Sequence, residues 1–208
     1  MRIIRCVKTC PEGYAKGVVA LGNFDGVHLG HQAVIQAAKA EAKRQGTLSA
    51  VMTFEPHPVS VLKPDIPSFR IETFREKAAH IGALGIDALW VVRFDRNFAL
   101  VPADAFVEQI LLQQLDIRHV VIGRDFIFGH NRQGNAALLA EILARKGVGV
   151  TQIPPVTVPS PFGEAVGTEC SSSAVREALK QGEMDKVTLM LGRPYVIAGN
   201  VRHGEERG

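Results

Sequence analysis

The segment that most constrains this fold is residues 18–32, where an apolar run leads into G-N-F-D-G-V-H-L-G-H-Q. The pattern predicts a strand, a tight glycine turn and then a helix. His28 and His31 stand three positions apart at the start of that helix, so both imidazoles lie on one face. A helix N-terminus has unpaired N–H groups and about half a positive charge, which favours an anion such as a phosphate. Gly30 between the histidines leaves the backbone open to a bulky ligand.

A purely structural role and a zinc site are the two alternatives to phosphate binding by the histidine pair. A histidine near a helix start is often a surface or capping residue, although an H-x-G-H frame directly after a glycine turn is harder to account for in this way. Zinc is the second alternative, but a catalytic zinc site takes about three protein ligands. The sequence has no H-E-x-x-H motif and no Cys/His cluster that would supply the third ligand. We therefore favour phosphate and predict no metal-ligating residues.

Composition and charge limit the class of protein. The chain has 208 residues, of which 46% are hydrophobic and 22% charged, as is ordinary for a globular core. The net charge is +3 and the basic residues are scattered, so neither nucleic acid nor a membrane surface is an expected partner. No run is long enough to cross a bilayer, and no signal peptide is apparent. The three cysteines, Cys6, Cys10 and Cys170, lack metal spacing. We expect free thiols in a cytoplasmic protein, although Cys6 and Cys10 would be able to pair.

Apolar runs alternate with helical patterns along the chain, which is typical of a Rossmann-like, doubly wound α/β fold. Such a fold has a mostly parallel sheet with helices on both faces. Strands are expected at residues 18–21, 48–54, 88–94, 119–122 and 149–153. Helices are expected at residues 28–45, 72–84, 102–113, 136–146, 173–181 and 183–191, with a further short strand at 195–201. Catalytic groups in this fold class lie in the loops after the strands.

Two of these loops carry a second and a third motif. Residues 53–58 read T-F-E-P-H-P, and the two prolines predict an extended loop, which taken alone would be an ordinary surface turn. Residues 121–130 read V-I-G-R-D-F-I-F-G-H, in which Gly123 permits close approach of a ligand and Asp125 would hold a ribose hydroxyl or a magnesium-bound water. We expect Phe126 and Phe128 to point to opposite sides of this segment, at least one of them into the core.

The fourth motif is the segment E-C-S-S-S-A-V-R-E-A-L at residues 169–179. Serines before a helix are usually N-caps. Followed closely by an arginine, they also form a cradle for a polyphosphate, in which hydroxyls and backbone N–H groups bind oxygens and Arg176 binds two oxygens at once. Taken alone, this segment is weak evidence for such a site.

Together the four segments resemble one family. H-x-G-H after an apolar strand is similar to the nucleotidylyl transferase superfamily. The full set of motifs, in this order over most of residues 18–180, resembles the FMN adenylyltransferase (FAD synthetase) module of bacterial bifunctional riboflavin kinase/FAD synthetase. The chain departs from the family pattern at Ile127, where the family often carries Arg. It also has Cys170, Ser173 and Val175 where the pattern I-S-S-T-x-I-R-x-x-L has Ile, Thr and Ile.

The resemblance implies transfer of AMP from ATP to FMN, giving FAD and pyrophosphate, with Mg²⁺ held mainly by substrate phosphates and water. The catalytic residues that it implies are His28, His31 and Arg176. The implied ATP-binding residues are Gly22, Asn23, Phe24, Asp25, Gly30, Gly123, Asp125, Ser171, Ser172 and Ser173. The implied FMN-binding residues are Phe54, Pro56, His57, Phe126, Phe128, Arg132 and Asn135.

The resemblance also divides the chain. Residues 1–191 are expected to form the adenylyltransferase domain, and residues 192–208 resemble the truncated start of a riboflavin kinase barrel, so we expect no phosphorylation of riboflavin. No oligomeric state is indicated. Two alternatives remain: another enzyme of the superfamily, such as a cytidylyltransferase, which would lack the T-F-E-P-H-P and G-R-D-F-I-F-G motifs, and a non-catalytic flavin or nucleotide binder.

Overall fold

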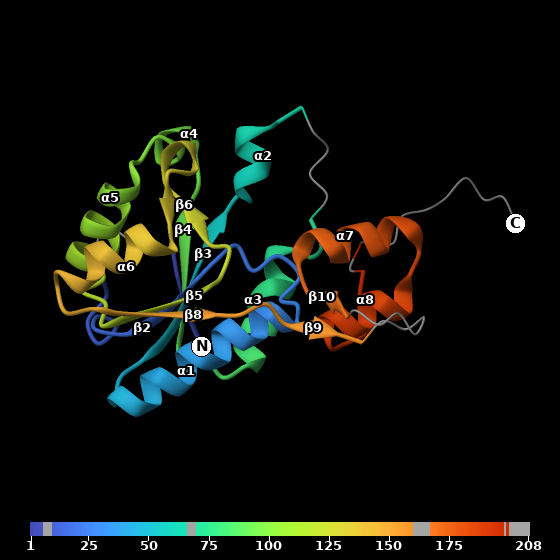
Figure 1. Cartoon of the computed structure of the whole chain (residues 1–208), viewed down its shortest axis with the longest axis horizontal. Helices are drawn as coiled ribbons and strands as arrows, with labels where there is room; N and C mark the ends of the chain where they lie inside the picture. The colour runs from blue at the N-terminus through green and yellow to red at the C-terminus, as the bar shows by residue number, and fades with distance from the viewer. Residues whose placement is uncertain (6–9, 66–69, 160–166, 198, 200–208) are drawn as a thin grey trace, which may run out of the picture.

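The computed structural model describes residues 1–5, 10–65, 70–159, 167–197 and 199, and its centre is a six-stranded sheet (Figure 1). The strand order is β1-β4-β3-β2-β5-β8, and every pairing in this sheet is parallel. The strands are β1 (Arg2–Ile4), β2 (Val18–Leu21), β3 (Ser49–Glu55), β4 (Ala88–Arg93), β5 (His119–Gly123) and β8 (Gly149–Ile153). The inner strands are almost wholly buried, as expected of a parallel sheet that is covered on both faces.

Helices cover both faces of the sheet. On one face, α1 (Leu29–Gln45) and α3 (Phe74–Ala83) bury apolar side chains such as Ile35 and Ile81 against the strands. On the other face lie α5 (Ala103–Ala105), the π-helical continuation η1 (Phe106–Gln114) and α6 (Ala136–Ala144). The expectation of a doubly wound α/β fold is therefore confirmed.

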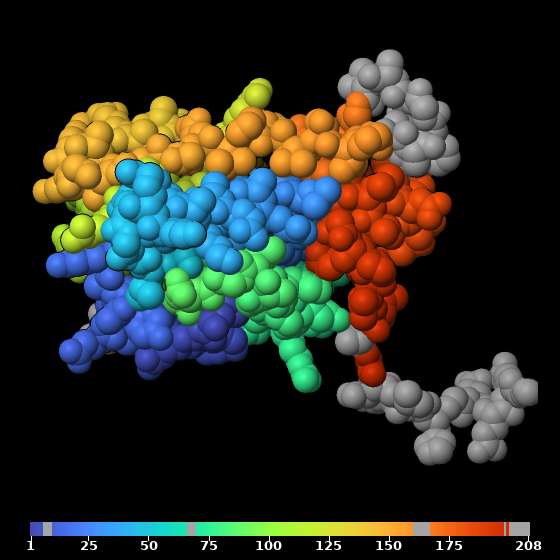
Figure 2. Space-filling model, turned by 90° about the horizontal axis from the view of Figure 1, so that it is seen from below, coloured from blue at the N-terminus to red at the C-terminus, as the bar shows by residue number. Residues whose placement is uncertain are grey.

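A third apolar cluster stands at the end of the sheet. Helices α7 (Ser172–Gln181) and α8 (Met184–Leu191) pack together there, away from α5 and α6 (Figure 1). Their apolar residues form a cluster with Ile71, Val158 and Cys170. Seen from below, the N-terminal end of α1 abuts these orange and red helices (Figure 2). The last two helices therefore extend the domain beside the strand ends rather than over a face of the sheet.

The strand order places a switch point at the centre of the sheet. The chain leaves β2, passes through α1 and pairs as β3 on one side, whereas β5 pairs on the other side of β2. In open α/β sheets, ligands bind outside the carboxyl ends of the strands at such a point. The loop after β2 carries the histidine pair, so this topology brings it to the expected place.

The structure adds short elements that periodicity did not indicate. Strand β1 pairs with β4 at the sheet edge. The expected loop at 123–135 contains an antiparallel pair, β6 (Ile127–Phe128) and β7 (Gly134–Asn135), joined through the 3-10 turn η2 (His130–Arg132). The remaining additions are α2 (Pro58–Leu62), α4 (Arg96–Ala99), β9 (Thr157–Val158) and β10 (Thr168–Glu169). Elements of two to five residues are too short to produce a readable period.

Two expectations concern parts of the chain outside or at the border of the described ranges. Residues 195–197 and 199 are not in a strand, and the rest of the strand expected at 195–201 lies outside the described residues. Cys10 and Cys170 carry free thiols, whereas Cys6 lies outside the described residues. Within the described ranges, no helix is both long and apolar enough to span a bilayer.

Candidate active site

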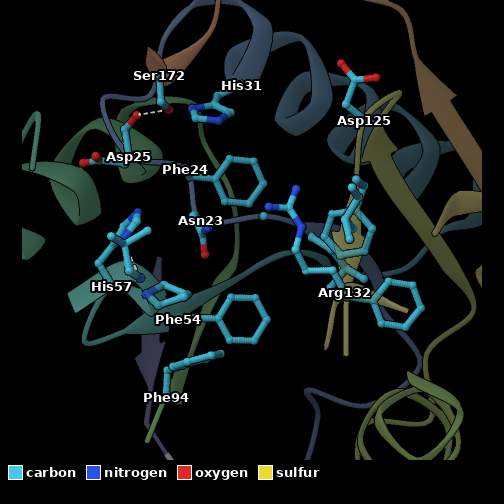
Figure 3. A pocket seen from close by; sticks show the side chains of 18 of the residues that line it. Asn23, Phe24, Asp25, His31, Phe54, His57, Phe94, Asp125, Arg132 and Ser172 are labelled. Carbon is cyan, nitrogen blue, oxygen red and sulfur yellow. Dashed lines mark hydrogen bonds between the residues drawn. The ribbon is translucent and has the colours of Figure 1, made fainter. Parts of the chain in front are cut away.

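A cavity of about 1280 Å³ opens at the carboxyl ends of the parallel strands. Leu21, Phe54, Gly123 and Ile153 line it from the ends of four different strands, and α7 contributes to its wall. Most of the predicted site residues line this cavity (Figure 3): Gly22, Asn23, Phe24, Asp25, His28, Gly30, His31, Phe54, His57, Gly123, Asp125, Phe126, Phe128, Arg132, Ser171, Ser172 and Arg176. The four sequence motifs thus meet in one place.

Three predicted site residues do not line the cavity. Pro56 is exposed beside it, and its neighbours His57 and Pro58 line the wall instead. Asn135 uses its side-chain oxygen to cap α6, accepting the Leu138 N–H at 2.9 Å. Ser173 is exposed on the first turn of α7. Each belongs to a motif that reaches the cavity, but backbone direction turns these three side chains away from it.

The histidine pair is held at the start of α1. His28 is the N-cap residue, and its Nδ1 accepts the His31 N–H at 3.3 Å. The two rings stack with centroids 3.6 Å apart and planes 24° apart. Phe24 meets the His31 ring edge-on at 5.2 Å. Among the described residues, the buried Nδ1 of His31 has no hydrogen-bond partner. A buried polar atom is costly to leave unpaired, so this nitrogen is ready for a ligand or water.

Burial fixes the protonation of both histidines. It lowers the pKa of His28 to about 4, with Arg176 and Arg193 acting in the same direction and Asp25 opposing them. Burial also lowers the pKa of His31 well below its ordinary value, and the neighbouring His28 adds to this. Both rings are therefore neutral near pH 7. Because His28 Nδ1 accepts a hydrogen bond, its own proton is on Nε2, which is a neutral donor for an anion.

Gly30 lines the cavity and also makes room for its neighbours in the fold. A Cβ at this position would lie 3.0 Å from the Cys170 carbonyl oxygen and 3.1 Å from Cε1 of the His28 ring. The missing side chain therefore allows the segment before α7 and the His28 ring to pack against α1. Gly123 fits its expectation better, because a Cβ there would meet nothing within 4 Å.

Arg176 is fixed by a buried carboxylate. On α7, its Nη2 forms an ion pair with Asp25, which is only 2% exposed. Asp25 also accepts the Ile71 N–H at 3.2 Å, and its carbonyl oxygen accepts the Ser172 hydroxyl at 2.9 Å (Figure 3). Asp25, predicted to bind ATP, therefore also ties α7 to the loop after β2. The ion pair with Asp25 holds the planar guanidinium of Arg176 in place, and such a group can bind two phosphate oxygens at once.

Phenylalanine side chains line one part of the cavity, which forms its aromatic part. Phe54, Phe98 and Phe106 pack with ring centroids 5.8–6.3 Å apart, and Phe128 joins them at 5.6 Å from Phe106. Phe126 stacks on Phe128 at 5.4 Å with planes 20° apart. The two rings therefore lie on the same side, and the expectation that they point to opposite sides is wrong. Residues two positions apart in an extended segment share a face, because only successive side chains alternate.

Arg132 adds a positively charged side chain to this part of the cavity. Its side chain points into the cavity toward the Phe24 side, whereas Asp125 stands apart (Figure 3). The backbone of Asn131 and Arg132 is left-handed, with φ of 51° and 59°. Such φ values are uncommon for residues with a side chain and often occur at functional sites.

Sequence reasoning missed a buried lysine beneath the site. Lys77 of α3 is 1% exposed, and its Nζ donates to the Asn23 carbonyl oxygen at 3.1 Å and to Thr53 Oγ1 at 3.2 Å. Glu55 lies 3.6 Å from the same ammonium. A lysine in a helix carries no signal of burial, so only the packing of α3 against the loop after β2 reveals it.

Other cavity residues were also missed. Phe94, Phe98 and Phe106 appeared only as ordinary apolar residues, and Arg96 lies in none of the four motifs. They lie on several different elements, and nothing in their spacing connects them. Their approach to one cavity is a consequence of strand order.

Comparisons with known proteins agree with this geometry. The family model described as FAD synthetase matches residues 11–161. The bifunctional riboflavin kinase/FMN adenylyltransferase of Escherichia coli (strain K12) is 34% identical over 209 residues, which cover 100% of this chain and 64% of that protein. The protein of the same name from Bacillus subtilis (strain 168) is 39% identical over 198 residues, covering 95% of this chain and 60% of that protein. The chain spans less than two thirds of the length of these curated relatives.

Solved structures share the fold. One described as the macrolide-efflux protein of Streptococcus pneumoniae superimposes with a TM-score of 0.72 at 26% identity, covering 93% of this chain and 70% of that chain. The pantothenate synthetase of Thermus thermophilus gives a TM-score of 0.50 at 14% identity, covering 92% of this chain and 82% of that chain. The second likeness concerns the fold alone.

Proposed function

Because the chain belongs to the FAD synthetase family, we propose that it transfers the adenylyl group of ATP to FMN, giving FAD and pyrophosphate. The observation that carries this proposal is the meeting of His28, His31 and Arg176 at the switch point of the sheet, within a cavity of about 1280 Å³. Pockets for small ligands have volumes of about 300–1,000 Å³. This cavity exceeds that range, which supports binding of two substrates, one of them against its aromatic part.

The chemistry requires positioning more than acid–base catalysis. A phosphate oxygen of FMN forms a bond to the α-phosphorus of ATP, and the bond from that phosphorus to the bridging oxygen breaks, releasing pyrophosphate. The FMN phosphate is already anionic near pH 7, so no general base is needed. His28 and His31 would donate hydrogen bonds to the α-phosphate as charge develops there, and Arg176 would bind the departing phosphates.

The remaining wall residues support a division of the cavity. The loop after β2, with Gly22, Asn23 and Phe24, lies beside the histidines and would hold the nucleotide. The aromatic part around Phe54, with Arg132 pointing into the cavity, would hold the flavin ring and its phosphate (Figure 3). A planar ring gains from edge and face contacts with aromatic side chains.

Mg²⁺ would arrive with ATP. Among the described residues, no group of three or more His, Cys, Asp or Glu side chains is placed to hold a metal ion. This donor set fits an ion that keeps several waters and binds substrate phosphates, as Mg²⁺ does in many nucleotide sites.

FAD formation from FMN and ATP by the purified chain, followed by chromatography, tests the proposal. We expect His31→Ala to lower kcat by about 100-fold, as the loss of one transition-state donor does in other enzymes. His119→Ala is the matched control. His119 stands at the end of β5 opposite to the cavity, where its side chain forms a hydrogen bond with Thr151 of β8. Binding of both substrates without any FAD would instead support the non-catalytic binder.

A parallel reaction with riboflavin in place of FMN tests the division of the chain. We propose that residues 1–191 carry adenylyl transfer and that residues 192–208 belong to a following riboflavin kinase module. FMN from riboflavin and ATP would contradict that division. We also propose a cytoplasmic location, which the free thiols of Cys10 and Cys170 support.

A further inference from the structure

Arg193, immediately after α8, reaches back across the molecule to the loop that presents the histidines. Its Nη2 donates to the Gly26 carbonyl oxygen at 2.7 Å, and its Nη1 donates to the Val27 carbonyl oxygen at 3.1 Å. The side chain is 22% exposed, so these bonds are largely shielded from water. Arg193 lies two residues beyond the expected domain boundary at residue 191, and its hydrogen bonds reach the loop after β2.

A second side chain reinforces this junction. Gln32 of α1 donates from Nε2 to both the Val27 and the Leu191 carbonyl oxygens, each at 2.9 Å. Arg193 Nη1 also donates to the Leu191 carbonyl oxygen, at 3.2 Å. Two side chains therefore connect the last turn of α8 to the residue before the N-cap of α1. Figure 2 shows α8 against this end of α1.

A buried carboxylate completes the arrangement. Glu72 is 7% exposed and accepts the Gly26 N–H at 3.0 Å, while Arg193 Nη2 lies 3.2 Å from its other oxygen. His80 Nδ1 lies 2.7 Å from the same oxygen. Gly26 is thus held at both its N–H and its carbonyl group. Its φ of 89°, with Ile71 2.9 Å from where a Cβ would be, allows no side chain in this turn.

We propose that Arg193 is a positioning residue for adenylyl transfer: by fixing Gly26 and Val27, it sets the direction in which His28 and His31 face the α-phosphate. This inference rests on the proposed function. Val27 directly precedes His28, which is the N-cap residue of α1. Without the guanidinium, the Gly26 carbonyl oxygen would lose its bond from Arg193, and the Val27 carbonyl oxygen would keep only the bond from Gln32. The loop would then move while the sheet and the aromatic part of the cavity stay in place. A misplacement of about 1 Å at a reacting group can cost about 100-fold in rate.

The test compares Arg193→Ala, Arg193→Lys and Arg145→Ala with the wild-type chain. Arg145 is the matched control, because it is 68% exposed and pairs with Glu141 on the outer surface of α6. We expect Arg193→Ala to lower kcat by about 10-fold or more. Its Kd for FMN, measured by flavin fluorescence, should stay within about 2-fold, because the aromatic part is not touched. Free guanidinium should restore part of the kcat that Arg193→Ala loses. The kcat of Arg193→Lys should lie between that of the wild type and that of Arg193→Ala.

Hydrogen exchange gives a readout that does not depend on activity. Amides of residues 22–28 should exchange faster in Arg193→Ala, while those of β3 and β5 keep the wild-type rate. Unchanged exchange in this loop, or an unchanged kcat, would overturn the inference. If the Ala variant does not fold, the same two measurements on Arg193→Lys decide. If the wild-type chain makes no FAD, the proposed function fails, and loop exchange still decides whether Arg193 holds the loop.

Discussion

At the scale of single residues, burial decides the form in which the histidines act. His28 is 5% exposed, and its pKa of about 4 makes it a neutral donor near pH 7. Neutral imidazoles fit a site that also contains the cationic Arg176, since three adjacent positive charges would repel one another. In the proposed reaction Arg176 would supply the charge for the phosphates, and its pairing with Asp25 holds it in position.

The depressed pKa of His28 predicts a loss of stability in acid. In the unfolded chain this imidazole gains a proton as the pH falls through 6.5, whereas in the folded chain it stays neutral until about 4. The stability is therefore complete above about pH 6.5 and is lost as the pH falls toward 4.

Between about pH 7 and pH 5, the free energy of unfolding should fall by about 2 kcal/mol more in the wild type than in His28→Asn. Asparagine keeps an N-cap acceptor, so the helix start is preserved. Urea unfolding at the two pH values measures the difference. Parallel pH dependence in the two proteins would show that His28 titrates normally in the folded chain.

At the scale of elements, the start of α7 both caps a helix and lines the cavity. Ser171 Oγ accepts the Ala174 N–H at 3.1 Å, and the Ser172 hydroxyl joins α7 to the loop after β2. Ser173, the next residue, faces solvent. Three adjacent serines thus have three different environments, because successive side chains on a helix point about 100° apart.

This difference predicts opposite outcomes for two adjacent substitutions. Ser171→Ala should lower the free energy of unfolding by about 1 kcal/mol through the lost N-cap, and should raise the KM for ATP because Arg176 is on the same helix. Ser173→Ala should change stability by no more than about 0.5 kcal/mol and leave that KM unchanged. Chemical denaturation and steady-state kinetics measure both. A raised KM for ATP in Ser173→Ala would contradict this prediction and would indicate that the Ser173 hydroxyl binds ATP.

At the scale of the whole molecule, the cavity exists because elements far apart in sequence meet at one sheet edge. The loops after β2, β3, β4, β5 and β8 contribute, and α7 closes one side. The histidine pair and the aromatic part lie in the same continuous cavity, so two substrates would share one space without competing for the same wall.

Simultaneous occupation predicts additive stabilisation by the two ligands. FMN or a non-reactive ATP analogue, each present at about 100 times its Kd, should raise the free energy of unfolding by about 2.7 kcal/mol. Together they should raise it by the sum. Denaturant unfolding with each ligand and with both measures this. A combined effect no larger than the greater single effect would show that the two ligands exclude each other.

The fold class and the four motifs that meet at the cavity follow from local patterns in the sequence. Strands and helices with clear periodicity were placed within a few residues, and H-x-G-H, T-F-E-P-H-P, G-R-D-F-I-F-G and S-S-S-A-V-R all contribute to the cavity. These features are local: a strand ends, a turn follows, and a helix begins with its donors unpaired. The identity of residues in consecutive positions is enough to indicate such a structure.

How those segments meet depends on long-range packing, which no local pattern reveals. This packing buried Lys77 beneath the loop after β2, gathered the phenylalanines, turned Ser173 and Asn135 away from the cavity and brought Arg193 to Gly26. Gly26 and Arg193 are 167 residues apart in sequence. No period or motif joins them, because their contact follows from strand order and from the packing of α8 against α1. The pKa values of the histidines depend on burial for the same reason, since desolvation is a property of the folded chain.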